Sequence, residues 1–488
     1  MLFNSFSFLI FLAFIVAVYY SIPPRFRWLL VLAGSYYFYM FREAKPAIWL
    51  ALTTVISYLC VLGMARSERR KKNFLTLGIL FNLGALFVTK YLNFSLIQFG
   101  NLFEFIGWAG TASGVPHWDI KYPAGLSFFT FAAITYLIDV YRGKMSVEKD
   151  LRHVAVYISF FPKVLAGPIE RARTFLPQWK NRVPFDPDRF TAGLQLILWG
   201  LFKKVVIADR LAALVNSAYG RVAYVPPLEL LLATYFFAFQ IYCDFSGYTD
   251  IALGTSNLLG FNLMENFRRP YLSKSTPEFW GSRWHISLAT WFRDYLYIPM
   301  GGSRVSWPRH YFNLMMVFAV SGLWHAGLGL AMSWTFLVWG ALNGLYQWVS
   351  VFTGKFWQIL GARFPKVERS LIWHVLRVVL TFHLIAFSWV FFRARSIADA
   401  WTVMQRIVKN LDDLPSLIGQ YPFSTEHYIS FILIAILISL EILDEKKSMW
   451  ERLRVGPRVV RWVYYYALIF GLIIIGDWQL ATFIYMQF

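Results

Sequence analysis

Long apolar runs, separated by short polar or basic stretches, dominate the chain. A membrane-spanning helix needs about 20 mostly apolar residues. Runs that approach this length lie at 5–22, 27–42, 46–64, 74–92, 123–141, 191–208, 226–243, 311–326, 329–351, 371–392, 428–443 and 463–481. Two shorter apolar segments, 154–168 and 251–263, are interrupted by Gly or Pro, which is typical of re-entrant helices. The pattern predicts an all-α, polytopic membrane protein with roughly 11 to 13 spans plus re-entrant helices.

The composition supports this prediction. The 488 residues are 58% hydrophobic and only 15% charged, whereas about a quarter of the residues in a soluble domain are charged. The formal net charge of +20 comes from basic residues between the apolar runs, which is typical of cytoplasmic loops that face anionic lipid headgroups. We therefore expect membrane lipid as a partner and no nucleic acid. The two cysteines lie in or beside apolar runs and form no metal-binding pattern, so no metal is expected.

The distribution of Lys and Arg predicts the orientation in the membrane. Arg25 and Arg27 follow the first predicted span, and the basic run 66–72 follows the third, so these loops share the cytoplasmic side. A further basic patch at 446–461 precedes the last predicted span, 463–481. Both termini are therefore expected outside the cytoplasm.

The polar stretches between the spans are short. Residues 169–190 and 264–310 are rich in Arg, Trp and Pro and are predicted to form ordered cytoplasmic caps. We expect one membrane domain over 1–488 with an extracytoplasmic tail at 482–488.

His325 is the main candidate for chemistry. It lies in S-G-L-W-H-A-G, 321–327, near the end of a predicted span that begins on the cytoplasmic side. At 1.5 Å per residue it is predicted about 20 Å deep, where an ionisable group is costly and is by default a functional hypothesis. Imidazole also has a pKa suited to general-base catalysis near neutrality. The alternative is a core histidine bonded to a neighbouring helix.

His285 is the second candidate. It lies in the segment 278–297, where Trp284, Leu288, Trp291 and Tyr295 have the spacing of one helical face. The alternative is an amphipathic helix at the membrane interface without a chemical role for the histidine.

The segment Y-C-D-F-S-G-Y-T-D at 242–250 places Asp244 and Asp250 around a Ser-Gly pair at the end of an apolar run. The two carboxylates could pair with arginines of the caps, hold a cation or orient a histidine, and we favour a salt-bridged break in the helix. The chain contains no G-x-x-x-x-G-K-[ST] loop, which argues against an ATP-driven pump, and neither G-x-S-x-G nor H-E-x-x-H.

Several ordered motifs resemble one known family. They are Y-P-A-G-L-S-F-F-T-F at 122–131, I-D-V-Y-R-G at 138–143, F-P-K-V-L-A-G-P-I at 161–169, D-F-S-G-Y-T-D at 244–250, W-H-I-S-L-A-T-W-F-R-D-Y-L-Y-I-P-M-G-G at 284–302, S-G-L-W-H-A-G at 321–327 and F-S-W-V-F-F-R-A at 387–394. Together they resemble the membrane-bound O-acyltransferases, and more closely the bacterial, alginate O-acetyltransferase-like branch that acetylates exopolysaccharides.

The resemblance implies a ring of helices around a thin core, with a cytoplasmic funnel. His325 matches the invariant histidine of the family, and His285 matches its second histidine. The resemblance also implies that acetyl groups come from cytoplasmic acetyl-CoA, the donor substrate, and are delivered outside the membrane. Arg268, Arg269 and Arg283, together with Trp284, are the residues that we expect to bind the donor.

The last residues, F-I-Y-M-Q-F at 483–488, resemble the ending of alginate-type members, in which the tyrosine is proposed as a covalent acyl relay. This likeness makes Tyr485 a third catalytic candidate, and the alternative is an aromatic residue at the outer membrane interface. The implied setting is the bacterial inner membrane. The implied partners are a periplasmic or surface SGNH-type acetyltransferase and the machinery for polysaccharide synthesis and export.

Other functions stay open at this point. Alginate, cellulose, another exopolysaccharide and peptidoglycan are all possible acceptors, and the donor could carry a D-alanyl or longer-chain acyl group. From different functional classes, the alternatives are a glycan or lipid transporter and a non-catalytic scaffold.

Overall fold

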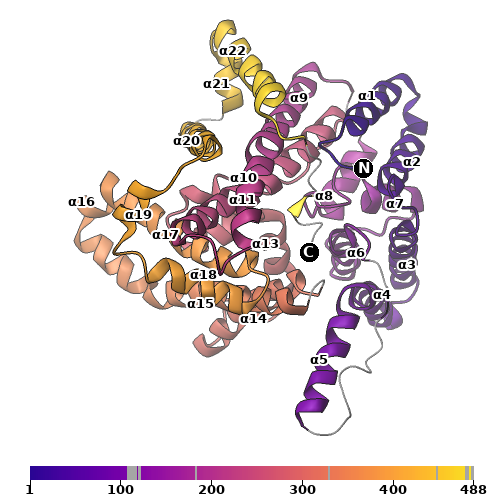
Figure 1. Cartoon of the computed structure of the whole chain (residues 1–488). Helices are drawn as coiled ribbons and strands as arrows, with labels where there is room; N and C mark the ends of the chain where they lie inside the picture. Colours follow the sequence, from indigo (N-terminus) through magenta and orange to yellow (C-terminus); the bar gives the residue numbers. More distant parts are fainter. Residues whose placement is uncertain are drawn as a thin grey trace. The chain divides into compact units, whose positions relative to one another are not determined.

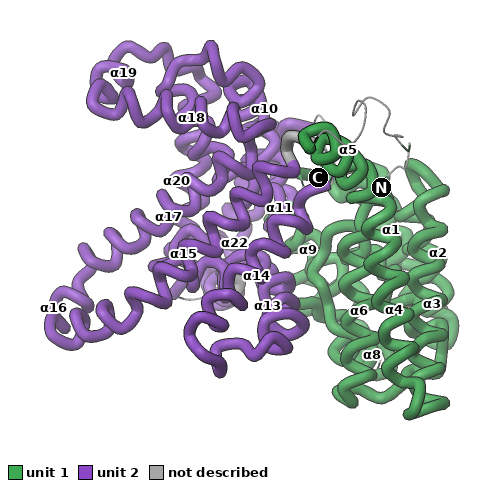
Figure 2. The backbone as a smooth tube through the Cα atoms, turned by 90° about the horizontal axis from the view of Figure 1, so that it is seen from below, with its two compact units in different colours: residues 1–200, 248–264, 482–488 green, residues 201–247, 265–481 purple. Residues whose placement is uncertain are grey.

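The computed structural model describes residues 1–106, 118, 122–181, 184–327, 330–446, 449–478 and 483–484. The chain divides into two compact units, coloured separately in Figure 2. Unit 1 comprises Met1–Gly200, Tyr248–Met264 and Thr482–Phe488, and unit 2 comprises Leu201–Gly247 and Glu265–Ala481.

Unit 1 is built from apolar helices and short connectors. They are α1 (Phe6–Ser21), η1 (Pro24–Phe26), α2 (Arg27–Met40), α3 (Ala47–Arg66), η2 (Glu68–Arg70), α4 (Lys71–Leu86), η3 (Phe87–Tyr91), α5 (Leu92–Phe105), α6 (Leu126–Tyr141), α7 (Leu151–Ser159), α8 (Ala172–Lys180) and α9 (Pro187–Leu201). Helices α3, α4 and α6 pack against one another (Figure 1). The core beside them is aromatic, because the fully buried rings of Phe38 and Phe161 lie 5.8 Å apart.

Unit 2 contains the two candidate histidines. Its elements are η5 (Phe202–Ala208), α10 (Asp209–Tyr219), the first part of α11 (Pro227–Leu258), η6 (Pro270–Leu272), α12 (Thr276–Glu278), η7 (Phe279–Arg283), α13 (Ile286–Phe292), η8 (Arg293–Tyr297), α14 (Trp307–His325), α15 (Leu330–Arg363), α16 (Pro365–Glu368), α17 (Leu371–Arg393), α18 (Ile397–Val408), α19 (Leu414–Gln420), α20 (Thr425–Lys446), α21 (Met449–Val455), α22 (Arg458–Phe470) and η9 (Gly471–Ile475). Among the described residues, the extended backbone pairing is limited to an isolated antiparallel bridge between Phe267 and Trp284.

The helices confirm the all-α, multi-pass membrane fold. Each long apolar run expected to span the membrane coincides with a helix. By length and composition, seven helical stretches of the described chain are sufficient to cross a membrane: Ala47–Arg66, Glu68–Phe105, Pro187–Tyr219, Pro227–Leu258, Leu371–Arg393, Thr425–Lys446 and Arg458–Ile475. The apolar helices α1 and α6 are shorter. The number of crossings stays a prediction, and so do the two caps and the single domain.

Two local expectations are wrong. The segment at 242–250 does not break its helix, because α11 continues through both aspartates to Leu258. The segment 278–297 is not one continuous helix. It is interrupted after η7, where Trp284 is extended and His285 has a left-handed backbone with φ of 44°.

Helices α14 and α15 form an antiparallel hairpin that positions His325. A Cβ atom at Gly322 would lie 2.6 Å from the carbonyl oxygen of Phe336 and 3.3 Å from the Cα of Gly340. Both neighbours are backbone atoms, so only glycine permits this approach. Small residues allow helices to pack this closely in membrane proteins. The crossing therefore fixes the last turn of α14, where His325 lies.

Candidate functional site

His325 is the last residue of α14 and is almost fully buried, with 5% of its surface exposed. The chain then turns, with Ala326 extended and Gly327 at φ of 111°. The backbone N–H of Gly327 donates to the hydroxyl of Ser333, at 2.9 Å, which secures the turn into α15. The end of α14 therefore holds the imidazole inside the unit, whereas its depth in a membrane stays a prediction.

Aromatic rings surround the imidazole of His325. The ring centroids lie 4.6 Å from Trp324, 5.0 Å from Phe392, 5.3 Å from Trp339 and 5.8 Å from Phe336. These rings come from α14, α15 and α17, so three helices build the wall. Such a wall excludes water and strengthens hydrogen bonds to the imidazole.

His285 occupies the break between η7 and α13 and is also buried. Its backbone is held by the short bridge, because Arg268 N–H donates to the Arg283 carbonyl at 2.9 Å and Ile286 N–H donates to the Asn266 carbonyl at 3.0 Å. Burial lowers the pKa of His285 to about 3, so its imidazole is neutral near pH 7. A neutral imidazole can donate or accept a hydrogen bond but does not carry a charge to a phosphate.

Trp324 connects the two histidines. Its ring centroid lies 6.3 Å from that of His285 and 4.6 Å from that of His325. Phe245 of α11 packs on His285, and their ring centroids lie 4.6 Å apart. The structure therefore brings both predicted histidines together, although 40 residues separate them in sequence. We call the two imidazoles and the aromatic rings packed around them the ring cluster.

A family model and known proteins identify the chain. The model of the membrane-bound O-acyltransferase family matches residues 144–394, which include both histidines. The chain belongs to the membrane-bound O-acyltransferase family. It is 36% identical to a probable alginate O-acetylase of Azotobacter vinelandii over 410 residues, covering 82% of this chain and 77% of the relative.

Other relatives of this acyltransferase differ in their named acceptors. A peptidoglycan O-acetyltransferase of Helicobacter pylori is 31% identical over 430 residues, which cover 82% of this chain and 77% of the relative. A teichoic acid D-alanyltransferase of Bacillus subtilis is 26% identical over 289 residues, which cover 57% of this chain and 70% of the relative. The chain is therefore an acyltransferase of a family whose members act on different polymers.

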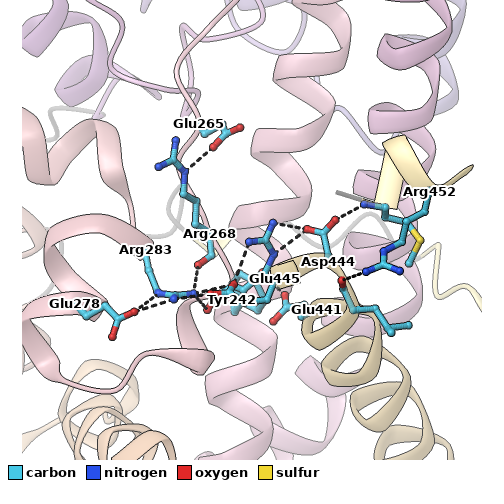
Figure 3. Close-up of polar contacts among 12 residues, drawn as sticks. Tyr242, Glu265, Arg268, Glu278, Arg283, Glu441, Asp444, Glu445 and Arg452 are labelled. Carbon is cyan, nitrogen blue, oxygen red and sulfur yellow. Dashed lines mark hydrogen bonds and ion pairs between the residues drawn. The ribbon is translucent and has the colours of Figure 1, made fainter. Parts of the chain in front are cut away.

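The expected donor-binding arginines of the acyltransferase are paired with carboxylates (Figure 3). Arg269 lies 2.6 Å from Asp444 and 3.0 Å from Glu445. Arg283 lies 2.7 Å from Glu445 and 2.8 Å from Glu278, and the exposed Arg268 pairs with Glu265 at 2.8 Å. A donor phosphate would have to compete with these carboxylates for the guanidinium groups. Phosphate binding by the arginines therefore stays a prediction.

Trp284 is packed inside the ring cluster instead of lining an open surface. It is 2% exposed and stacks on Phe279, with centroids 5.3 Å apart and an interplanar angle of 16°. Its ring also lies 5.1 Å from Phe267 and 5.1 Å from Trp389. Contact with a donor therefore stays a prediction for Trp284.

Tyr485 lies outside the described residues. Phe483, two positions earlier, is buried and stacks on Tyr248 in unit 1, with ring centroids 4.8 Å apart. Of the tail, the structure describes Phe483 and Ile484, and both are buried.

Sequence reasoning missed a buried ion triad in unit 2. The ammonium of Lys204 lies 2.7 Å from Asp209 and 2.5 Å from Asp244, and all three side chains are at most 7% exposed. Asp244 therefore pairs with a lysine of η5. The signal was present in the sequence, because Lys203 and Lys204 interrupt the apolar run 191–208 and a buried charge needs a partner.

Proposed function

We propose that this acyltransferase moves an acetyl group from cytoplasmic acetyl-CoA to a hydroxyl group outside the membrane. The observation that carries the proposal is the ring cluster in which Trp324 contacts both His285 and His325. An enclosed pair of histidines suits acyl transfer, since the thioester must be protected from hydrolysis by water.

In the proposed reaction, His325 is the general base. Its imidazole removes the proton of the acceptor hydroxyl while the hydroxyl oxygen attacks the thioester carbonyl carbon. The carbon–sulfur bond then breaks, and the leaving thiolate takes the proton from the imidazolium. His285, which is neutral, positions the thioester carbonyl or the hydroxyl by a hydrogen bond. Atoms and charge balance without a metal or a redox step.

The proposed topology follows from charge. The distribution of basic loops favours both termini outside the cytoplasm, and the membrane that we propose is the bacterial inner membrane. Tyr485 would then lie on the acceptor side and could carry the acetyl group as a phenyl ester before transfer to a secreted SGNH-type acetyltransferase. Exopolysaccharides such as alginate or cellulose are the acceptors that we favour, because the named alginate relatives share more identity with this chain than the peptidoglycan relative does. The polysaccharide synthesis and export machinery would supply them.

The test uses membrane vesicles that contain the full chain and acetyl-CoA labelled in the acetyl group. The variant His325→Ala should lose base-labile acetyl ester formation by at least about 100-fold, the usual contribution of a general base. The matched control is His383→Ala, since His383 is an exposed histidine on α17 whose ring bonds a carbonyl within its own helix. Wild-type ester formation by His325→Ala would exclude the proposal and favour a scaffold or transporter.

The donor and the relay are tested in the same vesicles. Unlabelled acetyl-CoA should suppress labelling, whereas a longer-chain acyl-CoA or a D-alanyl thioester should not; the opposite order would replace acetyl with that acyl group. Mass spectrometry of the wild type should find an acetyl adduct on Tyr485. If Tyr485→Phe transfers acetyl at the wild-type rate, the relay is excluded, while the role of His325 stands.

A further inference from the structure

The C-terminal end of α20 presents two carboxylates to the segment that carries His285. One carboxylate, that of Glu445, contacts two guanidinium groups at once. It accepts from Arg269 at 3.0 Å and from Arg283 at 2.7 and 3.1 Å. Figure 3 shows the contact with Arg283. Arg269 follows Phe267 and Arg283 precedes Trp284, so one arginine lies on each of the two segments that the antiparallel bridge between Phe267 and Trp284 joins. The bridge pairs the segments 266–269 and 283–286, and the second of them carries His285. We call these two segments the hairpin and each segment an arm. Glu445 therefore connects both arms of the hairpin.

Neighbouring carboxylates use the remaining donors of the same arginines. Asp444 accepts from Nε of Arg269 at 2.8 Å and lies 2.6 Å from its Nη2. Glu278 accepts from Nε of Arg283 at 2.8 Å. Guanidinium–carboxylate pairs of this kind fix direction as well as distance. The arrangement is therefore suited to holding the hairpin in one geometry.

The hairpin needs such support because its backbone is strained at two points. Arg269 has φ of 43° and His285 has φ of 44°, and both are residues with a Cβ atom. A left-handed conformation costs such a residue about 1–2 kcal/mol. Strained residues persist only where the surrounding contacts over-determine them. Glu445 contacts Arg269, which is itself strained, and Arg283, which lies two positions before the strained His285.

We propose that Glu445 is a positioning residue for acyl transfer, which keeps His285 in the ring cluster by bridging Arg269 and Arg283. The inference rests on the proposed function, since it requires His285 to take part in the reaction. Without the bridge, the two arms of the hairpin lose their common anchor. His285 then shifts relative to Trp324 and the substrate, and a displacement of about 1 Å can cost up to about 100-fold in rate.

The first test is kinetic and compares two glutamates of unit 2. Glu445→Gln keeps the shape of the side chain and removes its charge. Its matched control is Glu368→Gln, because Glu368 has similar exposure (43% against 37%) and pairs with Arg377, which is not part of the hairpin. We expect Glu445→Gln to lower kcat for acetyl transfer by about 10- to 100-fold. The KM for acetyl-CoA should not rise, because the change removes a carboxylate that competes with a donor phosphate for Arg269 and Arg283. Glu368→Gln should match the wild type.

The second test measures the position of His285 directly. Diethylpyrocarbonate modifies accessible neutral imidazoles, and mass spectrometry of the peptides gives the rate at each histidine. In Glu445→Gln the rate at the buried His285 should rise, while the rate at the exposed His374 should not change. Global unfolding would instead raise the rate at every buried histidine, His325 included.

The outcomes separate the two proposals. If Glu445→Gln has the wild-type kcat and the wild-type rate of modification at His285, while His285→Ala and His325→Ala are inactive, the positioning role is wrong and the proposed function stands. If both histidine variants remain active, the proposed function itself is wrong. Should Glu445→Gln fail to fold, Arg283→Lys decides: it keeps the charge but loses the two-point contact, and a wild-type kcat would overturn the inference.

Discussion

Replacing Lys204 with Met should destabilise the protein strongly. The ammonium group lies between the carboxylates of Asp209 and Asp244, at 2.7 and 2.5 Å, and the three side chains are 7%, 5% and 3% exposed. Methionine has a similar unbranched stem and no charge. The variant Lys204→Met therefore leaves two buried carboxylates without the cation that they share.

The expected size of the effect follows from burial. Removing one partner of a buried ion pair costs about 3–5 kcal/mol, whereas an exposed pair contributes about 0–1 kcal/mol. For a unit of this size, each kcal/mol corresponds to a shift in Tm of about 2–4 °C. We expect Lys204→Met to lower Tm by about 6–20 °C. The control Lys71→Met removes the more exposed pair with Glu68, at 3.2 Å, and should shift Tm by less than about 4 °C.

The assay is thermal denaturation of the purified protein in one detergent at pH 7. The double variant Lys204→Met/Asp244→Asn removes one of the two buried carboxylate charges and should recover part of the lost Tm. If Lys204→Met melts within about 2 °C of the wild type, a shift expected for about 1 kcal/mol or less, these residues do not form a buried ion triad and the reasoning fails.

Two further predictions concern the histidines. In Gly322→Ala, the new Cβ meets the Phe336 carbonyl oxygen at 2.6 Å, so we expect a loss of about 1–3 kcal/mol and reduced acyl transfer. At Gly354 a Cβ meets nothing within 4 Å beyond its chain neighbours and the adjacent backbone of α15, so Gly354→Ala should keep the activity and should not lower Tm. Burial lowers the pKa of His285 from 6.5 to about 3, so the folded protein binds fewer protons than the unfolded chain between these values. The free energy of unfolding should therefore fall as pH drops through this window, by up to about 1.4 kcal/mol per pH unit. The slope of Tm against pH should be shallower in His285→Asn. An equal slope in the variant would contradict the lowered pKa of His285.

The helices were predictable because their main signal is local. The length of an apolar run determines whether a helix can cross a membrane, and this length is visible without any contact. The runs at 371–392 and 428–443 accordingly coincide with α17 and α20. The same local signal made His325 a candidate, since an imidazole near the end of an apolar run is costly unless it has a use. Its catalytic role stays a prediction.

The partners of the charged residues were not predictable from local pattern. Arg269 and Arg283 were expected to bind a donor phosphate, but two carboxylates that pair with them, Asp444 and Glu445, lie 162 to 176 residues away in sequence, at the end of α20. The break in the helix at His285 was not predictable for the same reason, because it depends on a contact that is not local. Its neighbour Trp284 follows helical spacing, yet it pairs with Phe267 across a bridge that helical periodicity does not reveal.

The two histidines of unit 2 lie in different environments, and each environment contributes differently to the proposed site. Around His325 the wall is made of rings from three helices, which exclude water but cannot fix a backbone direction by charge. Behind His285 the contacts are charged and directional, and they meet at Glu445. Because His285 is held in a strained backbone by that second set, the relative placement of the two histidines depends on contacts outside the ring cluster. A change at the end of α20 can therefore alter the proposed chemistry without touching either imidazole.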